Sequence, residues 1–293
     1  MPLLDPLLLR RHFGKAATGF DAAAVLPREA GKRLFESLDY LDDRQPEVIV
    51  EIGCGTGHNA ALLKKRWPKA RVIAVDAALP MLRQAKAQAG WWKPFNRVAG
   101  DASQLPLADA SVDLLVSNLC LPFVNDLPAT LAGFRRVLKP EGLLLCSTYG
   151  SETLGELDYA FSQADSAPHV HPFAPIATFG DALLRAGFRD PVIDRDLFTL
   201  TYADLPALMT ELRALGYRNA RDDRRRTLTG RGRFAAASQA YQALRTADGR
   251  LPSTWEVLYA HAWAPQAGTP IRQQGQDIAA VPVSAIPIRR KQP

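Results

Sequence analysis

A glycine-rich segment between two apolar, periodic runs constrains the fold of this 293-residue chain more than any other feature. It reads Glu51-Ile52-Gly53-Cys54-Gly55-Thr56-Gly57. The run before it, at 48–52, predicts a short buried strand, and residues 58–67 after it predict a helix that Pro68 ends. Glycines at such a turn let the backbone bend tightly and approach a ligand, which would face the N–H groups at the start of the helix.

Short apolar runs alternate with helical runs over residues 47–148. The predicted strands are 48–52, 71–75, 95–99, 112–117 and 143–147, and the predicted helices are 58–67, 79–89 and 126–138. This alternation is typical of βαβ units. The sequence therefore predicts an α/β fold with a mainly parallel sheet and, because crossovers are right-handed, helices on both faces.

The pattern changes along the chain and predicts three parts. Residues 1–45, helical from residue 12, form an N-terminal helical cover, 46–265 form the α/β domain, and 266–293 form a disordered tail rich in Gln, Gly and Pro. Within the domain, the later predicted helices are 151–164, 179–186, 205–215 and 234–244, and the later strands are 192–201 and 254–263. A helical insertion is therefore expected at about 203–250.

Composition excludes several classes of protein. Apolar residues make up 47% of the chain and charged residues 23%, as in ordinary globular proteins. Cys54, Cys120 and Cys146 form no CxxC pair, so we expect neither a disulfide framework nor a metal site, and a cytoplasmic location is favoured. No run has the length of a membrane span or the order of a signal peptide. A net charge of +6 is too small to indicate nucleic-acid binding but permits an acidic partner.

An acidic residue follows the second predicted strand. Asp76 stands where dinucleotide folds place an acid that accepts hydrogen bonds from both hydroxyls of a ribose. The dinucleotide fingerprint itself fails, because the third glycine falls one place early, at Gly57. A phosphate-binding P-loop is also excluded, because no Gly-Lys-Ser/Thr follows.

The E-x-G-x-G-x-G form and its following acid resemble the first motif of class I S-adenosylmethionine-dependent methyltransferases. Gly100-Asp101-Ala102, Ser117-Asn118-Leu119-Cys120 and Arg136-Val137-Leu138-Lys139-Pro140-Glu141-Gly142 stand where that family has its later motifs. The resemblance implies a Rossmann-like, seven-stranded class I methyltransferase sheet with a helical insertion. In the last motif, Gly142 is expected to be the C′ residue of a helix that Pro140 stops.

The resemblance implies a cofactor, S-adenosylmethionine, and residues that hold it. Asp76 is expected to bind the ribose and Asp101 the adenine amino group, while Glu51 orients the loop or meets the cofactor's ammonium group through water. The full predicted cofactor set is Glu51, Gly53, Gly55, Gly57, Asp76, Asp101, Ala102 and Asn118. No metal is expected.

The flanks resemble a narrower family, the malonyl-[acyl-carrier protein] O-methyltransferases of biotin synthesis. The segment His12-Phe13-Gly14-Lys15-Ala16-Ala17-Thr18-Gly19-Phe20-Asp21 carries this resemblance, together with residues 117–126, 153–157, 228–230 and 248–254. It implies methyl transfer to the free carboxylate of malonyl-acyl-carrier protein. Many members have Tyr where this chain has Phe20, which removes a phenol from this position.

An alternative stays open at this point. Residues 124–128 and 168–173 also resemble the methyltransferase-fold assembly factors of respiratory complex I, which act through protein contacts. Methylation of nucleic-acid bases is disfavoured, because Leu119 follows Asn118 where the Asn/Asp-Pro-Pro-Tyr motif would have proline.

The acceptor side has weaker signals. Tyr149, His169 and His171 follow the fifth strand and are candidates for binding the substrate carboxylate. Eight arginines fall between Arg213 and Arg233, and the predicted contacts to an acidic carrier protein are Arg213, Arg221, Arg224, Arg225 and Arg226. A solvated loop remains the other interpretation of this cluster.

Overall fold

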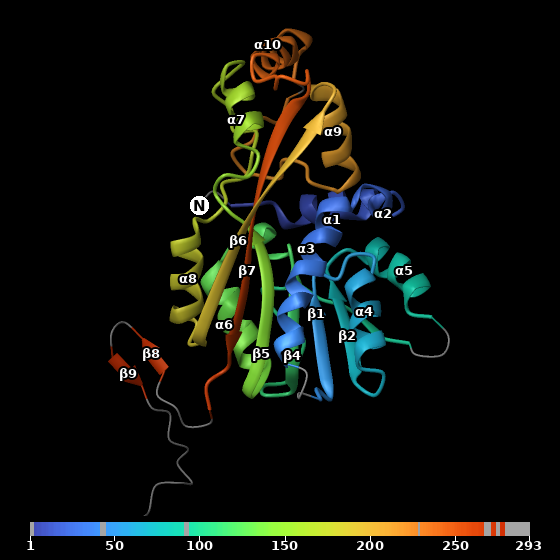
Figure 1. Ribbon diagram of the computed structural model, residues 1–293, viewed down its shortest axis with the longest axis vertical. Helices are drawn as coiled ribbons and strands as arrows, with labels where there is room; N and C mark the ends of the chain where they lie inside the picture. Colours follow the sequence, from blue (N-terminus) through green and yellow to red (C-terminus); the bar gives the residue numbers. More distant parts are fainter. Residues whose placement is uncertain are drawn as a thin grey trace, which may run out of the picture.

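Seven strands form one sheet in the computed structural model, which describes residues 3–41, 45–90, 94–227, 229–266, 271–273 and 276–278. The order is β3-β2-β1-β4-β5-β7-β6 (Figure 1). The strands are β1 (Val48–Ile52), β2 (Arg71–Asp76), β3 (Asn96–Ala99), β4 (Val112–Asn118), β5 (Leu138–Tyr149), β6 (Arg189–Tyr202) and β7 (Leu251–Trp263). Strands β1 to β5 pair in parallel, and β7 runs antiparallel to both β5 and β6. This confirms the predicted Rossmann-like, seven-stranded α/β fold.

Helices cover both faces of the sheet. One face packs against α3 (Val25–Glu36), α4 (His58–Arg66) and α5 (Leu79–Gln88), and the other against α6 (Leu127–Val137) and α8 (Ile176–Arg185). Side chains alternate along β1, so that Ile49 joins the first core and Val50 the second, and both are fully buried. Strands buried on both faces explain why the sequence shows continuous apolar runs here.

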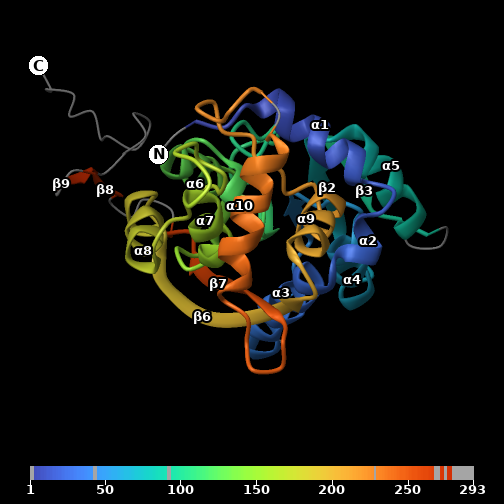
Figure 2. The same ribbon diagram turned by 90° about the horizontal axis from the view of Figure 1, so that it is seen from above.

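The N-terminal segment lies across the carboxyl edge of the sheet. It contains α1 (Pro6–Ala16) and α2 (Phe20–Ala23), and a 3-10 turn at Ser37–Leu41 follows α3 (Figures 1 and 2). Asp5 caps the start of helix α1, because its carboxylate accepts a hydrogen bond from the Leu8 N–H at 3.0 Å. Pro6 suits the first helical position, because its nitrogen has no hydrogen to pair. These helices form a roof over the strand ends.

A long ribbon carries a second lobe. Strand β5 pairs with β7 only from Val257 to Trp263. Residues Leu251–Glu256 of β7 extend beyond it and pair with β6 alone. Around this extension gather α7 (Gly155–Ser162), α9 (Leu205–Ala214) and α10 (Arg231–Gln242) (Figures 1 and 2). The segment predicted as a helical insertion, 203–250, contains α9 and α10 and separates β6 from β7.

The turn between α6 and β5 differs from the expectation. The helix ends at Val137 and Leu138 is already extended, so Gly142 is not a C′ residue. The left-handed position is Glu141, with φ 61°. A Cβ at Gly142 would lie 2.8 Å from the Lys139 carbonyl oxygen, so this glycine is needed for close backbone approach.

Two further predictions differ from the structure. The helix predicted at 151–164 starts later, at Gly155, because Leu154 has a left-handed φ of 59° that no α-helix continues through. In the tail, which was predicted to be disordered, β8 (Ile271–Gln273) and β9 (Gln276–Ile278) pair antiparallel; most other tail residues lie outside the described ones. Among the described residues, no helix is both long and apolar enough to cross a bilayer.

Gly216 follows the end of α9, packs against α1 and gives a stability prediction. Its φ is +78°, and an added Cβ would lie 2.9 Å from Cδ1 of Phe13. Gly249 has a similar φ of +75° but no atom within 4 Å of its Cβ position, so it is the matched control. Gly249→Ala should cost about 1–2 kcal/mol of unfolding free energy from backbone strain. Gly216→Ala should cost a further ~1–3 kcal/mol from overpacking against α1, measured by urea denaturation; equal losses would contradict this packing role.

Candidate active site

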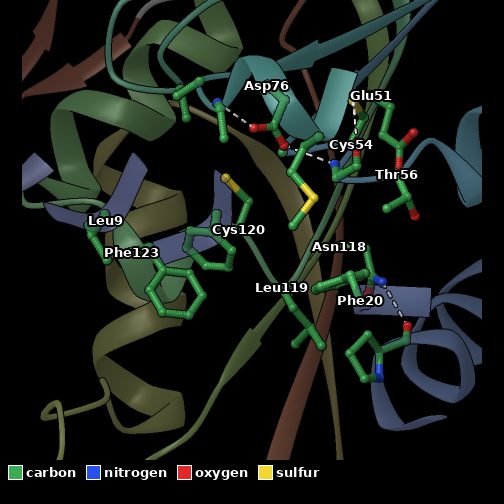
Figure 3. Close-up of a pocket in the computed structure, with 18 of the residues that line it drawn as sticks. Leu9, Phe20, Glu51, Cys54, Thr56, Asp76, Asn118, Leu119, Cys120 and Phe123 are labelled. Atoms are coloured by element: carbon green, nitrogen blue, oxygen red, sulfur yellow. Dashed lines mark hydrogen bonds between the residues drawn. The ribbon is translucent and has the colours of Figure 1, made fainter. Parts of the chain in front are cut away.

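A cavity lies at the carboxyl edge of the sheet, where the strand order reverses between β1 and β4. Open α/β sheets bind ligands at this point. The glycine loop after β1 forms its floor, Asp76 lines one side, and the roof contributes Leu9 and Phe20 (Figure 3). Asp101 also lines the cavity. All eight predicted cofactor residues except Gly57 line this cavity.

The three loop glycines all have positive φ, but they differ in what lies next to their Cβ positions. A Cβ at Gly53 would lie 2.5 Å from Cβ of Cys120, and a Cβ at Gly57 would lie 2.9 Å from Cβ of Ala85. These two glycines allow close packing inside the protein. At Gly55 only the Phe20 ring comes within 4.0 Å, across the cavity. Gly55 is therefore the glycine that leaves space for a ligand.

Four N–H groups of the glycine loop bond within the protein. Those of Gly53 and Cys54 both bond to the Val75 carbonyl, at 2.9 and 3.0 Å, and that of Gly57 bonds to the Cys54 carbonyl at 2.8 Å. The Gly55 N–H bonds to Asp76. These four donors are already satisfied within the protein, so at these positions the loop contributes shape and not hydrogen-bond donors.

Asp76 lies at the end of β2 with its carboxylate between two backbone segments. Oδ2 accepts from the Gly55 N–H at 2.8 Å, and Oδ1 accepts from the Ala78 N–H at 2.7 Å (Figure 3). Burial raises its pKa, and these two hydrogen bonds oppose the rise. Each oxygen keeps a further lone pair, so the carboxylate can accept from two ligand hydroxyls.

Glu51 is the deepest acid of the cavity. It is 2% exposed, and its Oε2 has no hydrogen-bond partner. Burial raises its pKa to about 8, although hydrogen bonds from Asn59 and the Ala60 N–H oppose this. A buried carboxylate with an unpartnered oxygen is a binding position for a cation.

Asp101 and Ala102 lie after β3, where the roof reaches the sheet. Burial alone would raise the pKa of Asp101, but hydrogen bonds from Ser103 and from Arg10 outweigh it and leave the pKa below its ordinary value. The Arg10 Nη2 donates to Asp101 Oδ2 at 2.9 Å. Asp101 is therefore an ionised acceptor at the cavity wall, and an ion pair joins it to α1.

Asn118 lines the cavity, but its amide is already engaged. Nδ2 donates to the Pro27 carbonyl at 2.9 Å (Figure 3). Oδ1 accepts from the Ser147 hydroxyl at 2.7 Å. It therefore ties the start of α3 to β4 and β5 while lining the cavity. This positioning role was not predicted from the sequence.

A second cavity of about 860 Å³ lies in the second lobe, beside α7 and α9. Its interior is mainly apolar and aromatic, with Tyr149, Leu157, Phe173, Leu212 and Trp255 among its walls. Phe123 and Tyr217 line both cavities, and their ring centroids are 5.2 Å apart. A reaction between molecules bound in the two cavities would take place beside these rings.

The three candidate acceptor residues all lie on the second cavity. Tyr149 is 1% exposed and donates a hydrogen bond from its hydroxyl to that of Tyr217 at 3.2 Å. His169 stacks on Phe161 and has its Nε2 3.0 Å from Asp165.

His171 is held from the backbone. Its Nε2 accepts from the Ala220 N–H at 3.3 Å, and burial together with the charge of Arg221 lowers its pKa to about 4, so the ring is neutral. Both histidines therefore have a structural partner, and Tyr149 reaches the junction of the cavities through Tyr217. Tyr217 was not predicted as a site residue, because it belongs to no recognised motif. Its only sequence signal is its place directly after Gly216, the glycine that follows α9.

The predicted arginine cluster divides into two groups. Arg221 pairs with both oxygens of Asp223 at 2.8 and 2.9 Å, and Arg225 pairs with Asp165 at 3.1 Å. Arg224 donates to the Arg221 carbonyl and lies 3.8 Å from Asp5.

The other group is more exposed. Arg213 and Arg226 lie on the rim of the second cavity, and no ion pair involves either within the described residues. Of the five arginines predicted to dock a carrier protein, these two have no ion pair within the described part of the chain and can meet a partner's acid.

Comparison with known proteins gives consistent matches. Residues 50–146 match the model of a family described as methyltransferase domain. A malonyl-[acyl-carrier protein] O-methyltransferase of Xylella fastidiosa (strain M23) is 55% identical over 99% of this chain and 98% of its own length. Proteins of the same name from Gallionella capsiferriformans (strain ES-2) and Methylovorus sp. (strain MP688) are 42% and 43% identical, each over 90% of this chain and 92% and 91% of their own lengths.

Solved structures show the same fold. The YcgJ protein of Bacillus subtilis superposes with a TM-score of 0.59 at 15% identity, covering 80% of this chain and 98% of its own. The Haemonchus contortus phosphoethanolamine N-methyltransferase 2 in complex with S-adenosyl-L-methionine gives 0.52 at 17% identity, covering 80% of this chain and 53% of its own.

Glu51 gives a pH prediction. Because its pKa is raised to about 8 in the folded protein, the folded state binds more protons than the unfolded state between pH 4.5 and 8, and stability falls as the pH rises through this window. Glu51→Gln should not show this loss of stability, because Gln does not ionise. The loss corresponds to about 1.4 kcal/mol for each unit by which the pKa is raised. Urea denaturation of the ligand-free protein should show the variant more stable than wild type at pH 8, with the difference vanishing near pH 4.5.

A matched control separates this effect from a general one. Glu36→Gln removes an exposed carboxylate from α3 and should leave the pH profile parallel to that of wild type. If Glu51→Gln also follows the wild-type profile, Glu51 is not the buried acid that the structure shows.

Proposed function

The chain belongs to the family of malonyl-[acyl-carrier protein] O-methyltransferases, and on that premise we propose that it methylates the free carboxylate of malonyl-acyl-carrier protein in biotin synthesis. The methyl donor is S-adenosylmethionine. The observation that carries this proposal is the pair of cavities that share Phe123 and Tyr217. One cavity has the acids that a cationic nucleoside needs, and the other has the volume and apolar walls that an acyl-pantetheine arm needs.

The residues of the first cavity fit the cofactor. The unpartnered Oε2 of Glu51 suits its ammonium group, the free lone pairs of Asp76 suit the ribose hydroxyls, and the ionised Asp101 suits the adenine amino group. Phe20 covers the space above Gly55 without a phenol. When bound, S-adenosylmethionine supplies a methyl group on a sulfonium, which a nucleophilic oxygen can take.

The chain's own residues align the acceptor and exclude water from it. A malonyl carboxylate is ionised at neutral pH, so no general base is required. Around the junction the rings of Phe13, Phe123 and Tyr217 lie with centroids 5.0 to 6.1 Å apart. An oxygen that enters this aromatic surround loses hydrating water and becomes a better nucleophile, while its position supplies the alignment.

Methylation has a physical consequence for the product. A free carboxylate is costly to bury in an apolar pocket. Its methyl ester is neutral and passes into such pockets. The reaction therefore prepares a malonyl group for enzymes that extend apolar acyl chains.

Transfer of radiolabelled methyl tests the proposed reaction. The purified protein should label malonyl-acyl-carrier protein in a form that mild base releases as methanol, because esters hydrolyse and methylated amines do not. Acetyl-acyl-carrier protein, which lacks the free carboxylate, should stay unlabelled. Label on the acetyl form, or none on the malonyl form, would contradict the proposal.

Docking of the carrier protein is proposed for the exposed part of the arginine cluster. Carrier proteins are acidic, and Arg213 and Arg226 lie on the rim without an acidic partner among the described residues. Arg221, Arg224 and Arg225, which were also predicted to dock it, each have an acidic partner within the protein, namely Asp223, Asp5 and Asp165. Rim charges of this kind steer association and depend on salt.

Charge reversal tests this docking. The double variant Arg213→Glu/Arg226→Glu should raise KM for malonyl-acyl-carrier protein about 10-fold at low salt, because it places acids against an acidic partner. KM for malonyl-pantetheine should change less than about 2-fold, since this small thioester lacks the carrier. Arg97→Glu, an exposed arginine on β3 at the far edge of the sheet, is the control and should change neither. Equal effects on both substrates would contradict docking.

A further inference from the structure

We propose that the phenol of Tyr217 binds the acceptor carboxylate and that Tyr149 is the residue that positions it. This inference rests on the proposed function and names the group that holds the substrate at the reacting end. The sequence made Tyr149 itself a candidate for binding the carboxylate. In the structure we assign this contact to Tyr217, to which the Tyr149 hydroxyl donates a hydrogen bond.

Position is the first argument. The methyl group must cross from the first cavity to the second, so the acceptor oxygen must lie where the two meet. Of the described residues only Phe123 and Tyr217 line both cavities, and of these only Tyr217 has a hydrogen-bonding side chain. It is fixed there by Phe13 and Phe123, whose ring centroids lie 6.1 and 5.2 Å from its own.

The hydrogen bond between the two tyrosines is the second argument. The Tyr149 hydroxyl donates to the Tyr217 oxygen at 3.2 Å. The proton of Tyr217 then has no acceptor among the described residues and is available to a ligand. Burial raises the pKa of Tyr217 to about 12, so the phenol stays protonated and is a donor throughout the neutral range.

The three histidines of the second cavity do not line the first. His169 is bonded to Asp165, and His171 accepts from the Ala220 N–H. His12 is buried with a free Nδ1, but it lines only the second cavity, and burial and the charges of Arg218 and Arg224 lower its pKa to about 4. None of these three lies at the junction.

The chemistry favours a neutral donor. A guanidinium would pair with both carboxylate oxygens and hold the nucleophilic lone pairs. One phenol occupies one oxygen and leaves the other free to face the sulfonium. That free oxygen forms the new O–CH3 bond as the S–CH3 bond breaks, the sulfur keeps the electron pair, and Tyr217 keeps its proton.

Binding measurements separate a carboxylate contact from a packing effect. Wild type and Tyr217→Phe are titrated, in the presence of S-adenosylhomocysteine, with malonyl-pantetheine and with its methyl ester, which has the same shape without the charge. Tyr217→Phe should weaken binding of the malonyl form about 10- to 100-fold, as expected for a hydrogen bond to a charged group. Binding of the methyl ester should change less than about 3-fold.

Two more variants complete the test. Tyr149→Phe should show the same selectivity with a smaller loss, about 3- to 10-fold, because Tyr217 remains but its hydroxyl is no longer oriented. Tyr159→Phe removes a phenol from an exposed side chain on α7 and should bind both ligands as wild type does.

The outcomes distinguish this inference from the function on which it rests. If wild type fails to bind or methylate the malonyl thioester, the proposed function fails. If wild type does both and Tyr217→Phe is unchanged, or loses both ligands equally, then Tyr217 does not hold the carboxylate and the inference is overturned while the function stands.

Discussion

Close packing of the glycine loop against the end of β4 is the constraint on which the site depends. The Gly53 backbone passes so near Cys120 that no Cβ fits between them, and Gly57 is packed in the same way against α5. This draws the carboxyl ends of β1 and β4 together exactly where the strand order reverses. The loop N–H groups bond within the protein, so the floor of the cavity is built before a ligand binds. Preorganisation of this kind reduces the ordering cost of binding.

Three polar contacts join the N-terminal helices α1, α2 and α3 to the strand ends and to the glycine loop. Asn118 holds the Pro27 carbonyl, Arg10 pairs with Asp101, and the Thr56 hydroxyl donates to Asp21 at 2.6 Å. The N-terminal helices are therefore part of the site and not an addition to the sheet. They enclose the first cavity on the side away from the strands and bring Phe13 to the junction with the second.

Charge is distributed unevenly between the two cavities. The first has buried or half-buried acids, suited to a cation, and the second has neutral aromatic walls with arginines on its rim. A cationic donor and an anionic acceptor with an acidic carrier match this distribution. Because the donor's leaving group is neutral and the acceptor is already ionised, the protein needs to supply shape, dehydration and one or two hydrogen bonds, and no catalytic triad.

The sequence alone determined the α/β class, the strands from β1 to β5, the glycine loop and the acids Glu51, Asp76 and Asp101. The class, the strands and Asp76 follow from short-range rules, namely periodicity and the residue at a strand end. Asp101 and the role of Glu51 were implied by the resemblance to class I methyltransferases. The tertiary structure decided what each residue does. Asn118 became a tie between elements, and Gly53 and Gly57 became packing glycines, because their neighbours come from distant segments. Tyr149 and Tyr217 are 68 residues apart, and only the fold of the β6–β7 ribbon and its insertion brings their hydroxyls together. No local pattern encodes such a contact, since it arises from how whole elements pack.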